Sequence, residues 1–258
     1  MSTSKKIVIA NWKMNPDNVA EAKDIFNGIK IGIKGCNKVQ TVICPPSIYL
    51  SVLSTNYKLQ TTNLFLGAQD ICHDKKGHHT GEISAEMVAN VGAKYVILGH
   101  SERREQGETS AQIARKINNA FDAGLRPVLC IGEKSRDEHG FFLKYIEEQL
   151  MESLDKVTRK RIPEIAFVYE PVWAISAYGD RPATPEEANE MAIYILKLLT
   201  GKIGLKEVKN IQILYGGSVD AENCKSYLEQ ASIRGLLVGS ASLDSKQFSE
   251  IVKTANSL

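Results

Sequence analysis

The stretch Lys6–Met14, which reads KIVIANWKM, contains the features that decide the fold. Its first part, Lys6–Ala10, is rich in isoleucine and valine without alternating polar residues, which is typical of a strand buried on both faces of a parallel sheet. The turn that follows, Asn11–Met14, holds no glycine. A doubly wound sheet would place a glycine-rich phosphate turn after its first strand, so this stretch argues against that class of fold.

Seven further runs rich in Val, Ile and Leu follow along the chain: Thr41–Cys44, Leu64–Ala68, Tyr95–Leu98, Pro127–Ile131, Ile165–Tyr169, Ile211–Leu214 and Gly235–Val238. Helical patterns lie between them, among them Val19–Ile29, Ser110–Ala123, Phe141–Leu154, Glu186–Leu199 and Lys246–Ala255. Two local signals support these helices. Thr184–Glu187 has the pattern of a capping box with proline at the first helical position, and Gly124 stands where the helix ending at Ala123 needs a left-handed cap.

The alternation of strands and helices predicts an α/β protein built as one closed (β/α)₈ barrel, with eight parallel strands and outer helices. Eight strands in 258 residues leave about 32 residues per unit, near the minimum for a βαβ repeat. No linker or shift in composition divides the chain, so we expect a single domain over residues 1–258. Glycine turns come late, at Gly216-Gly217 and Gly239, after the last two strands, where such barrels often hold a phosphate.

Composition excludes several classes of protein. Apolar residues make up 43% of the chain and charged residues 24%, and the formal net charge is only +2, which gives no indication of a nucleic-acid surface. The five cysteines are widely spaced without a CxxC pair, which argues against a disulfide framework. No apolar run approaches the ~18 residues of a membrane span or forms a signal-peptide core. We therefore expect a cytoplasmic protein that binds neither nucleic acid nor membranes.

Chemically useful residues follow several of the predicted strands. In a barrel of this kind the active site lies at the carboxyl ends of the strands, so these residues meet at one mouth. They are Asn11 and Lys13 after the first strand, His100, Ser101 and Glu102 after the fourth, Glu170 after the sixth, Gly217 and Ser218 after the seventh, and Gly239 and Ser240 after the eighth. Each alone is more often a surface or ion-pairing residue, but their convergence favours catalysis.

Several of these residues belong to longer motifs: Asn11–Asn15, Thr80–Ser84, Tyr95–Arg104, Cys130–Glu133, Tyr169–Ile175, Ala183–Glu186 and Tyr215–Ser218. With these motifs in this order, the chain resembles the triosephosphate isomerase family over nearly its whole length. The resemblance implies interconversion of dihydroxyacetone phosphate and glyceraldehyde 3-phosphate through an enediolate, in glycolysis and gluconeogenesis. It implies that no metal and no organic cofactor is needed.

The resemblance also implies a role for each site residue. Glu170 would be the base, and His100 and Lys13 would stabilise the enediolate oxygens, with Asn11 assisting. The histidine would act as neutral imidazole because a helix N-terminus lowers its pKa. Ser101 would support the site. Glu102 would support it by bonding near Lys13, or would instead pair with a neighbouring arginine.

For the substrate phosphate, the resemblance implies contacts from backbone donors in the late turns and from one loop after the sixth strand. The contact residues would be Ser176, Gly217, Ser218, Gly239 and Ser240. It further implies a homodimer through the loop Cys72–Gly81, which in the family reaches into the neighbouring subunit. The histidines of that loop also allow a metal site, although their spacing matches no closed site.

This chain departs from the family pattern in the loop Ser176–Pro182, the expected lid, which is about two residues longer than usual. Pro182 should stiffen its end, and we expect Arg181 to point outward or to pair with Asp180. Gly239-Ser240 also replaces the usual glycine pair. Two alternatives therefore stand beside isomerase activity: a phosphate-binding barrel isomerase with an altered substrate range, and a catalytically impaired binding protein. Retention of three catalytic groups argues against the second alternative.

Overall fold

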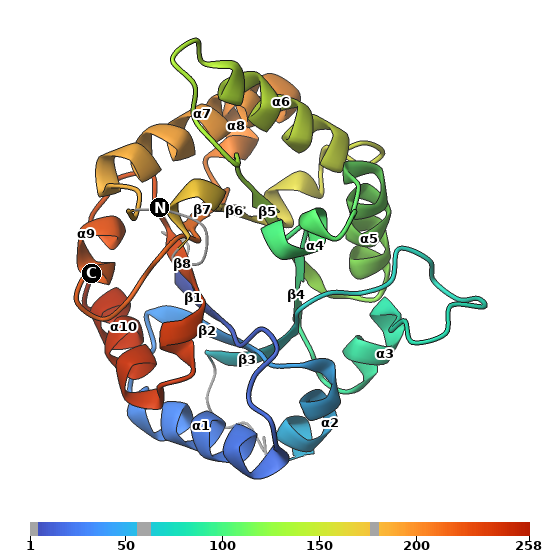
Figure 1. Cartoon of the computed structure of the whole chain (residues 1–258), viewed down its shortest axis with the longest axis vertical. Coiled ribbons are helices and arrows are strands. Elements are labelled where there is room, and N and C mark those ends of the chain that lie inside the picture. Colours follow the sequence, from blue (N-terminus) through green and yellow to red (C-terminus); the bar gives the residue numbers. More distant parts are fainter. Residues whose placement is uncertain (1–4, 56–62, 176–180) are drawn as a thin grey trace.

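A computed structural model describes residues 5–55, 63–175 and 181–258. In these residues eight strands, all parallel, close into a barrel in the order β1 to β8, and helices form a ring around it (Figure 1). The strands are β1 Lys6–Asn11, β2 Val39–Cys44, β3 Leu64–Ala68, β4 Tyr95–Leu98, β5 Arg126–Ile131, β6 Ala166–Tyr169, β7 Gln212–Tyr215 and β8 Gly235–Val238. The predicted fold class is therefore confirmed.

The helices of the outer ring are α1 Val19–Gly32, α2 Ser47–Thr55, α3 Ala85–Asn90, α4 Ser101–Glu105, α5 Ser110–Asp122, α6 Phe141–Ser153, α7 Pro185–Ile203, α8 Leu205–Val208, α9 Cys224–Leu228 and α10 Ser245–Ser257. Short 3₁₀ turns lie at Ile162–Glu164, Val172–Ala174 and Ser240–Ser242. The five helices expected from sequence are all present, with ends that differ by at most a few residues. No helix in the described ranges is long and apolar enough to cross a membrane.

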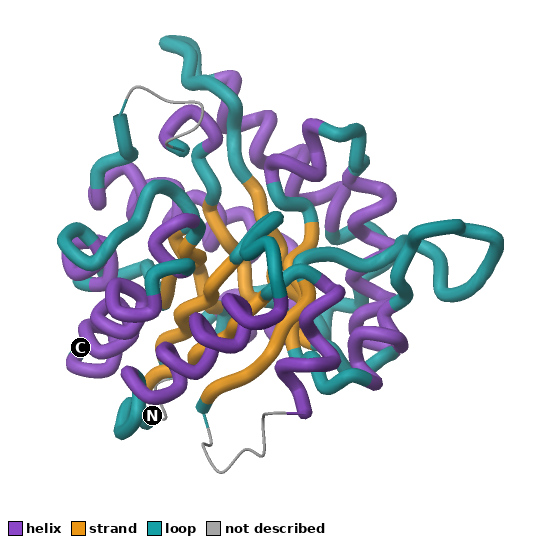
Figure 2. The backbone as a smooth tube through the Cα atoms, turned by 60° about the horizontal axis from the view of Figure 1, so that its bottom comes forward, coloured by secondary structure: helices purple, strands orange, loops and turns teal. Residues whose placement is uncertain are grey.

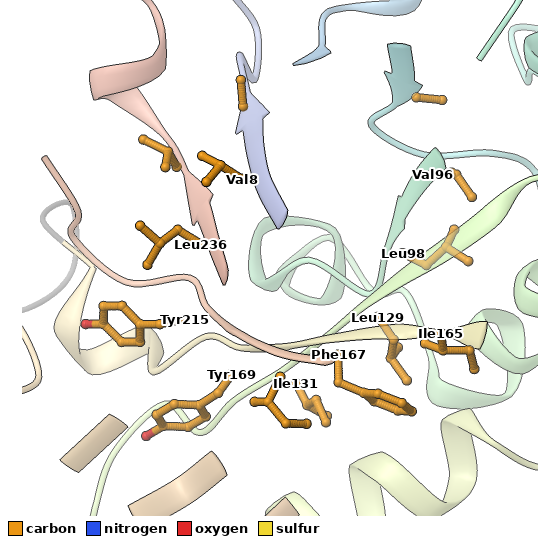
Figure 3. Packing of buried hydrophobic residues seen from close by; sticks show 14 of the residues in the cluster. Val8, Val96, Leu98, Leu129, Ile131, Ile165, Phe167, Tyr169, Tyr215 and Leu236 are labelled. Atoms are coloured by element: carbon orange, nitrogen blue, oxygen red, sulfur yellow. The ribbon is translucent and has the colours of Figure 1, made fainter. Parts of the chain in front are cut away.

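Successive side chains of each strand point to opposite faces, and this alternation divides the core into two clusters. Ile7 and Ile9 belong to a cluster made only of strand residues, which fills the barrel. Val8 and Ala10 belong to the larger cluster, which includes helix residues such as Phe26 of α1. Figure 3 shows strand residues of this larger cluster, among them Val8 and Phe167. Because both faces are covered, the strands need the unalternating apolar runs seen in the sequence.

The barrel closes where β8 pairs with β1, in the register Ile7 with Gly235 and Ala10 with Val238. At this seam the backbones approach so closely that a Cβ on Gly235 would lie 2.0 Å from the Ile7 carbonyl oxygen. A side chain would force the two strands apart, so glycine is required at this position.

Local signals fix where the predicted helices begin and end. Thr184 and Glu187 form the expected capping box at the start of α7, with Thr184 N–H 2.7 Å from the Glu187 carboxylate. Gly124 follows α5 with a φ of +74°, as expected for a left-handed cap. On the side of the barrel between β3 and α3, the loop that contains Cys72–Gly81 projects far from the body (Figures 1 and 2).

Replacing Phe248 by alanine should destabilise the barrel strongly. This α10 side chain is fully buried in the outer core, and loss of a buried phenylalanine costs about 3–5 kcal/mol. The free energy of unfolding, measured by urea denaturation, checks this expectation. Phe141→Ala is the matched control because Phe141 is 69% exposed, and it should change stability by less than about 0.5 kcal/mol. Equal losses for the two variants would contradict the packing described here.

Candidate active site

One cavity of about 610 Å³ opens at the carboxyl ends of the strands. Among the residues that line it are eight predicted from sequence: Asn11, Lys13, His100, Glu170, Gly217, Ser218, Gly239 and Ser240. They come from five different strand ends, which confirms that the barrel brings them together. Ser176 lies outside the described residues. Ser101 and Glu102 do not line the cavity but contact the residues that do.

Glu170 follows β6 and is only 2% exposed, so its charge depends on donors from the protein. The Ser101 N–H and hydroxyl donate to its two carboxylate oxygens at 3.0 Å each, and His100 Nε2 lies 2.9 Å from one of them. Burial raises the pKa of Glu170, but His100 and the two Ser101 donors lower it by more than burial raises it. The pKa therefore lies below the usual carboxyl range. Glu170 is therefore held as an ionised carboxylate.

His100 caps the N-terminus of α4. Its Nδ1 accepts the Glu102 N–H at 3.3 Å, which places the proton of a neutral imidazole on Nε2, facing Glu170. Burial lowers the pKa of His100, but the Glu170 carboxylate raises it, and the net shift is upward. The expected lowering of this pKa is therefore wrong for this arrangement. Apart from Glu170, burial and the N–H of Glu102 favour the neutral form, whereas the Glu102 carboxylate, 3.8 Å from Nδ1, favours the charged form.

Lys13 carries its ammonium group into the cavity from a strained backbone. Its φ is +54°, a left-handed conformation that costs a residue other than glycine on the order of 1–3 kcal/mol. Its Nζ lies 2.6 Å from the Glu102 carboxylate, so of the two roles considered for Glu102 the structure has the one beside Lys13. Asn11 supports the same turn, because its side-chain oxygen accepts the Lys13 N–H at 3.1 Å.

Gln69 completes this turn, and sequence reasoning missed it. Its side-chain amide donates to the Lys13 carbonyl at 2.8 Å and to the Cys44 carbonyl at 2.9 Å. The amide thus ties the strained turn to the end of β2. Gln69 directly follows β3, and that position at a strand end was the signal that could have found it.

The far rim of the cavity is formed by the turns after β7 and β8. A Cβ on Gly217 would lie 2.1 Å from the Tyr215 hydroxyl oxygen, so this turn requires glycine. The Ser218 hydroxyl donates to the Ala174 carbonyl at 3.0 Å. At Gly239 a Cβ would come no closer than 3.8 Å to its nearest neighbour, Lys13 Cε, so this turn has space for a side chain. The replacement in the usual glycine pair falls on the second position, Ser240, which begins the 3₁₀ turn Ser240–Ser242.

Behind Glu170, the end of β5 supports the segment that follows β6. A Cβ on Gly132 would lie 1.7 Å from the Glu170 carbonyl oxygen, so the two backbones are in direct contact. Glu133, 1% exposed, accepts three hydrogen bonds on one carboxylate oxygen, from Tyr169, Trp173 and Arg136. Sequence reasoning quoted Glu133 only as part of a motif and did not identify this role.

Arg181 is exposed, as one of the two sequence-based alternatives had it, but it has a partner that sequence reasoning did not name. Its guanidinium group donates to both carboxylate oxygens of Glu187 at 2.8 Å and lies 5.0 Å from the Trp173 ring centroid. A planar guanidinium matches a carboxylate in this two-bond geometry, and it also stacks favourably on an indole. The alternative partner, Asp180, lies outside the described residues.

In the loop Cys72–Gly81, two of the histidines face one aspartate. His79 Nε2 lies 3.0 Å and His73 Nε2 3.6 Å from Asp74, which also pairs with Arg115 of α5. Within the described ranges, no group of three or more His, Cys, Asp and Glu side chains is arranged to hold a metal ion.

The cavity thus joins an ionised carboxylate, an imidazole and an ammonium group on one side to glycine-containing turns on the other. A carboxylate can remove a proton from carbon, and the other two groups can stabilise the oxygen anions that form. The fold and the site together define a (β/α)₈-barrel isomerase that works by acid–base chemistry.

Comparison with known proteins identifies the family. The family model for triosephosphate isomerase matches residues 6–255. The chain is 40% identical over 250 residues to a triosephosphate isomerase from Aquifex aeolicus, covering 96% of this chain and 98% of the relative. It is 38% identical over 251 residues to one from Carboxydothermus hydrogenoformans, with 96% and 98% covered. The chain belongs to the triosephosphate isomerase family.

Replacing Gln69 by methionine should lower kcat/KM about 10- to 100-fold. The substitution keeps the volume but removes the donors that hold the Lys13 turn, and small displacements of a catalytic group have effects of this size. Steady-state kinetics and urea denaturation together separate lost catalysis from lost stability. Gln230→Met, at a half-buried position that does not line the cavity, is the control. Activity within about twofold of that control would contradict the role given to Gln69.

Proposed function

We propose that this chain interconverts dihydroxyacetone phosphate and glyceraldehyde 3-phosphate, a step of glycolysis and gluconeogenesis, in the cytoplasm. The observation that carries the proposal is the convergence of Lys13, His100 and Glu170 on one cavity in a chain of this family. The cavity of about 610 Å³ has room for a triose phosphate.

In the proposed reaction, the Glu170 carboxylate leaves His100 and Ser101 and takes a proton from the carbon next to the substrate carbonyl. The electron pair of that C–H bond forms a carbon–carbon double bond, and the carbonyl pair moves onto its oxygen, which gives an enediolate. His100 then donates its Nε2 proton to that oxygen and takes the hydroxyl proton from the other oxygen, while Glu170 returns its proton to the neighbouring carbon, which converts ketose to aldose. The positioned base contributes typically about 10²- to 10⁴-fold to the rate.

The enediolate oxygens would be stabilised by His100 Nε2–H and the Lys13 ammonium group, with the Asn11 side chain assisting. Such preorganised donors are commonly worth about 10²- to 10³-fold each. The Glu102 carboxylate keeps Lys13 in place, and α4, which His100 caps, keeps the imidazole proton on Nε2. The movement of Glu170 away from His100 favours the neutral imidazole at the moment when it is needed.

For the phosphate group, we propose contacts from the turns that contain Gly217, Ser218, Gly239 and Ser240, and from Ser176. Glycine allows the Gly217 backbone to lie against Tyr215 and leaves the turn open to the cavity. Backbone N–H groups in turns of this kind suit a dianion.

Glu170→Gln should lower kcat about 10²- to 10⁴-fold while the fold is kept, because the amide has the same volume and cannot accept the proton. The measurement is a coupled assay with dihydroxyacetone phosphate, with circular dichroism to confirm folding. Glu147→Gln, on the exposed face of α6, is the control and should keep full activity. A Glu170→Gln enzyme with more than about a tenth of the original activity would refute the role of the base.

We further propose a homodimer in which the loop Cys72–Gly81 of one copy enters the other. The loop projects from the body in both views (Figures 1 and 2) and is held by Asp74 with His79 and Arg115. A second cavity of about 380 Å³, lined by Lys13, Met14 and Gln69 among others, offers a place for it. Met14 is 92% exposed, and a partner loop would cover it.

Replacing residues 74–79 by a short glycine linker should therefore give a monomer with reduced activity, because the partner loop would no longer support the Lys13 turn. Sedimentation velocity at micromolar concentration measures the first effect and the coupled assay the second. The unmodified chain should sediment as a dimer. A fully active monomer of the unmodified chain at that concentration would rule the dimer proposal out, and a fully active monomer of the variant would contradict the support given to the Lys13 turn.

A further inference from the structure

We propose that Arg181 is a positioning residue for Glu170, and that it sets how tightly the site binds a phosphate-bearing ligand. It does so by holding the segment Pro171–Ile175, here called the Trp173 segment, where it lies when Glu170 is paired with His100. The inference rests on the proposed function, because it assigns the phosphate group to the turn that contains Ser218.

The Trp173 segment is linked to the Glu170 backbone as one hydrogen-bonded unit. It follows Glu170 directly, and its 3₁₀ turn is closed by hydrogen bonds from Ala174 N–H to the Pro171 carbonyl (2.9 Å) and from Ile175 N–H to the Val172 carbonyl (3.2 Å). A displacement of the Glu170 backbone toward the substrate therefore carries the Trp173 indole with it.

Three side chains hold that indole in its present place. Its Nε1–H donates to Glu133 at 2.8 Å. The guanidinium carbons of Arg136 and Arg181 lie 5.1 and 5.0 Å from the indole ring centroid, within the range of cation–π attraction. Arg136 donates to Glu133 in the cluster behind β6 and also lies 3.9 Å from Glu187, whereas Arg181, at the start of α7, makes both of its carboxylate hydrogen bonds to Glu187.

Arg181 is fixed before any ligand arrives. Both oxygens of Glu187 accept its hydrogen bonds at 2.8 Å, and Glu187 is itself fixed in the capping box with Thr184. The hydrogen bond from Arg181 lowers the pKa of Glu187 to about 2, so the pair stays ionised throughout the neutral range. The Trp173 segment is thereby tied to the first turn of α7.

Arg181 holds the Trp173 segment in place, whereas binding of a phosphate would release it. The Ser218 hydroxyl donates to the Ala174 carbonyl at 3.0 Å, and a hydroxyl has only one proton to donate. If that proton turns to a phosphate oxygen, the contact with Ala174 is lost and one end of the Trp173 segment is released. Arg181 opposes this release, so ligand affinity is reduced by the stability of its contacts.

The sign of the effect separates this inference from simple electrostatics. Arg181 is a cation near a site for an anion, so a purely electrostatic role predicts weaker phosphate binding when the charge is removed. A positioning role predicts tighter binding, because the segment is released more easily. An exposed ion pair and cation–π contact of this kind correspond to an effect of about two- to fivefold.

The experiment compares Arg181→Gln and Glu187→Gln with the unmodified enzyme, using inorganic phosphate as a competitive inhibitor. Both variants should lower the inhibition constant about two- to fivefold, and the double variant should add nothing further. Glutamine at position 187 keeps the capping box, so helix α7 is preserved. The chain has two tryptophans, and ¹⁹F NMR of enzyme containing 5-fluorotryptophan should show a shifted Trp173 signal in the free variants.

Arg161→Gln is the matched control. Arg161 lies 4.0 Å from the Phe121 ring centroid and 3.4 Å from Glu164, so it makes the same two kinds of contact away from the cavity. It should change neither the inhibition constant nor the Trp173 signal. An Arg181→Gln enzyme with an unchanged or higher inhibition constant, or with an unshifted Trp173 signal, would overturn the inference.

If the proposed function is wrong, the unmodified chain will show no isomerase activity, and this result differs from every outcome above. In that case the ¹⁹F titration with inorganic phosphate replaces the inhibition assay. The same change in affinity is then expected, and its absence still overturns the role given to Arg181.

Discussion

A buried carboxylate must be paired, and the structure around the active site follows from that constraint on Glu170. At 2% exposure, the charge of Glu170 is stabilised by Ser101 and His100, which supply donors to both oxygens. The same donors hold the carboxylate in a resting position, so it must exchange one set of partners for another during the reaction. Gly132 also helps to position Glu170, because only glycine allows the residue after β5 to lie against the Glu170 backbone.

The other catalytic side of the cavity is built on strain that several contacts offset. Lys13 has a left-handed backbone, and the hydrogen bonds of Asn11 and Gln69 compensate for its cost. Glu102 then fixes the ammonium group at the end of the flexible side chain. The turn, its two supports and the charged partner come from three strand ends, so the geometry of Lys13 depends on how the barrel places those strands.

The strands were predictable from sequence because burial on both faces requires apolar runs, and the main site residues were predictable because they stand at strand ends. Gln69, Glu133 and Arg136 were not assigned roles, because their function lies in contacts with residues distant in the chain. The partner of Arg181 was missed for the same reason: Glu187 belongs to the next helix, and local sequence rules consider only neighbours. The pKa of His100 was misjudged because it depends on Glu170, which is 70 positions further along the chain.

The seam between β1 and β8 gives the order of synthesis a structural meaning. Asn11 and Lys13 are made before the other strands of the barrel, but β1 has its second neighbour only when Gly235–Val238 has been added. Until then β1 is an open sheet edge, and the turn at Gly239 that faces Lys13 does not exist. A nascent chain therefore carries Lys13, His100 and Glu170 before Gly235–Val238 closes the barrel and completes the cavity.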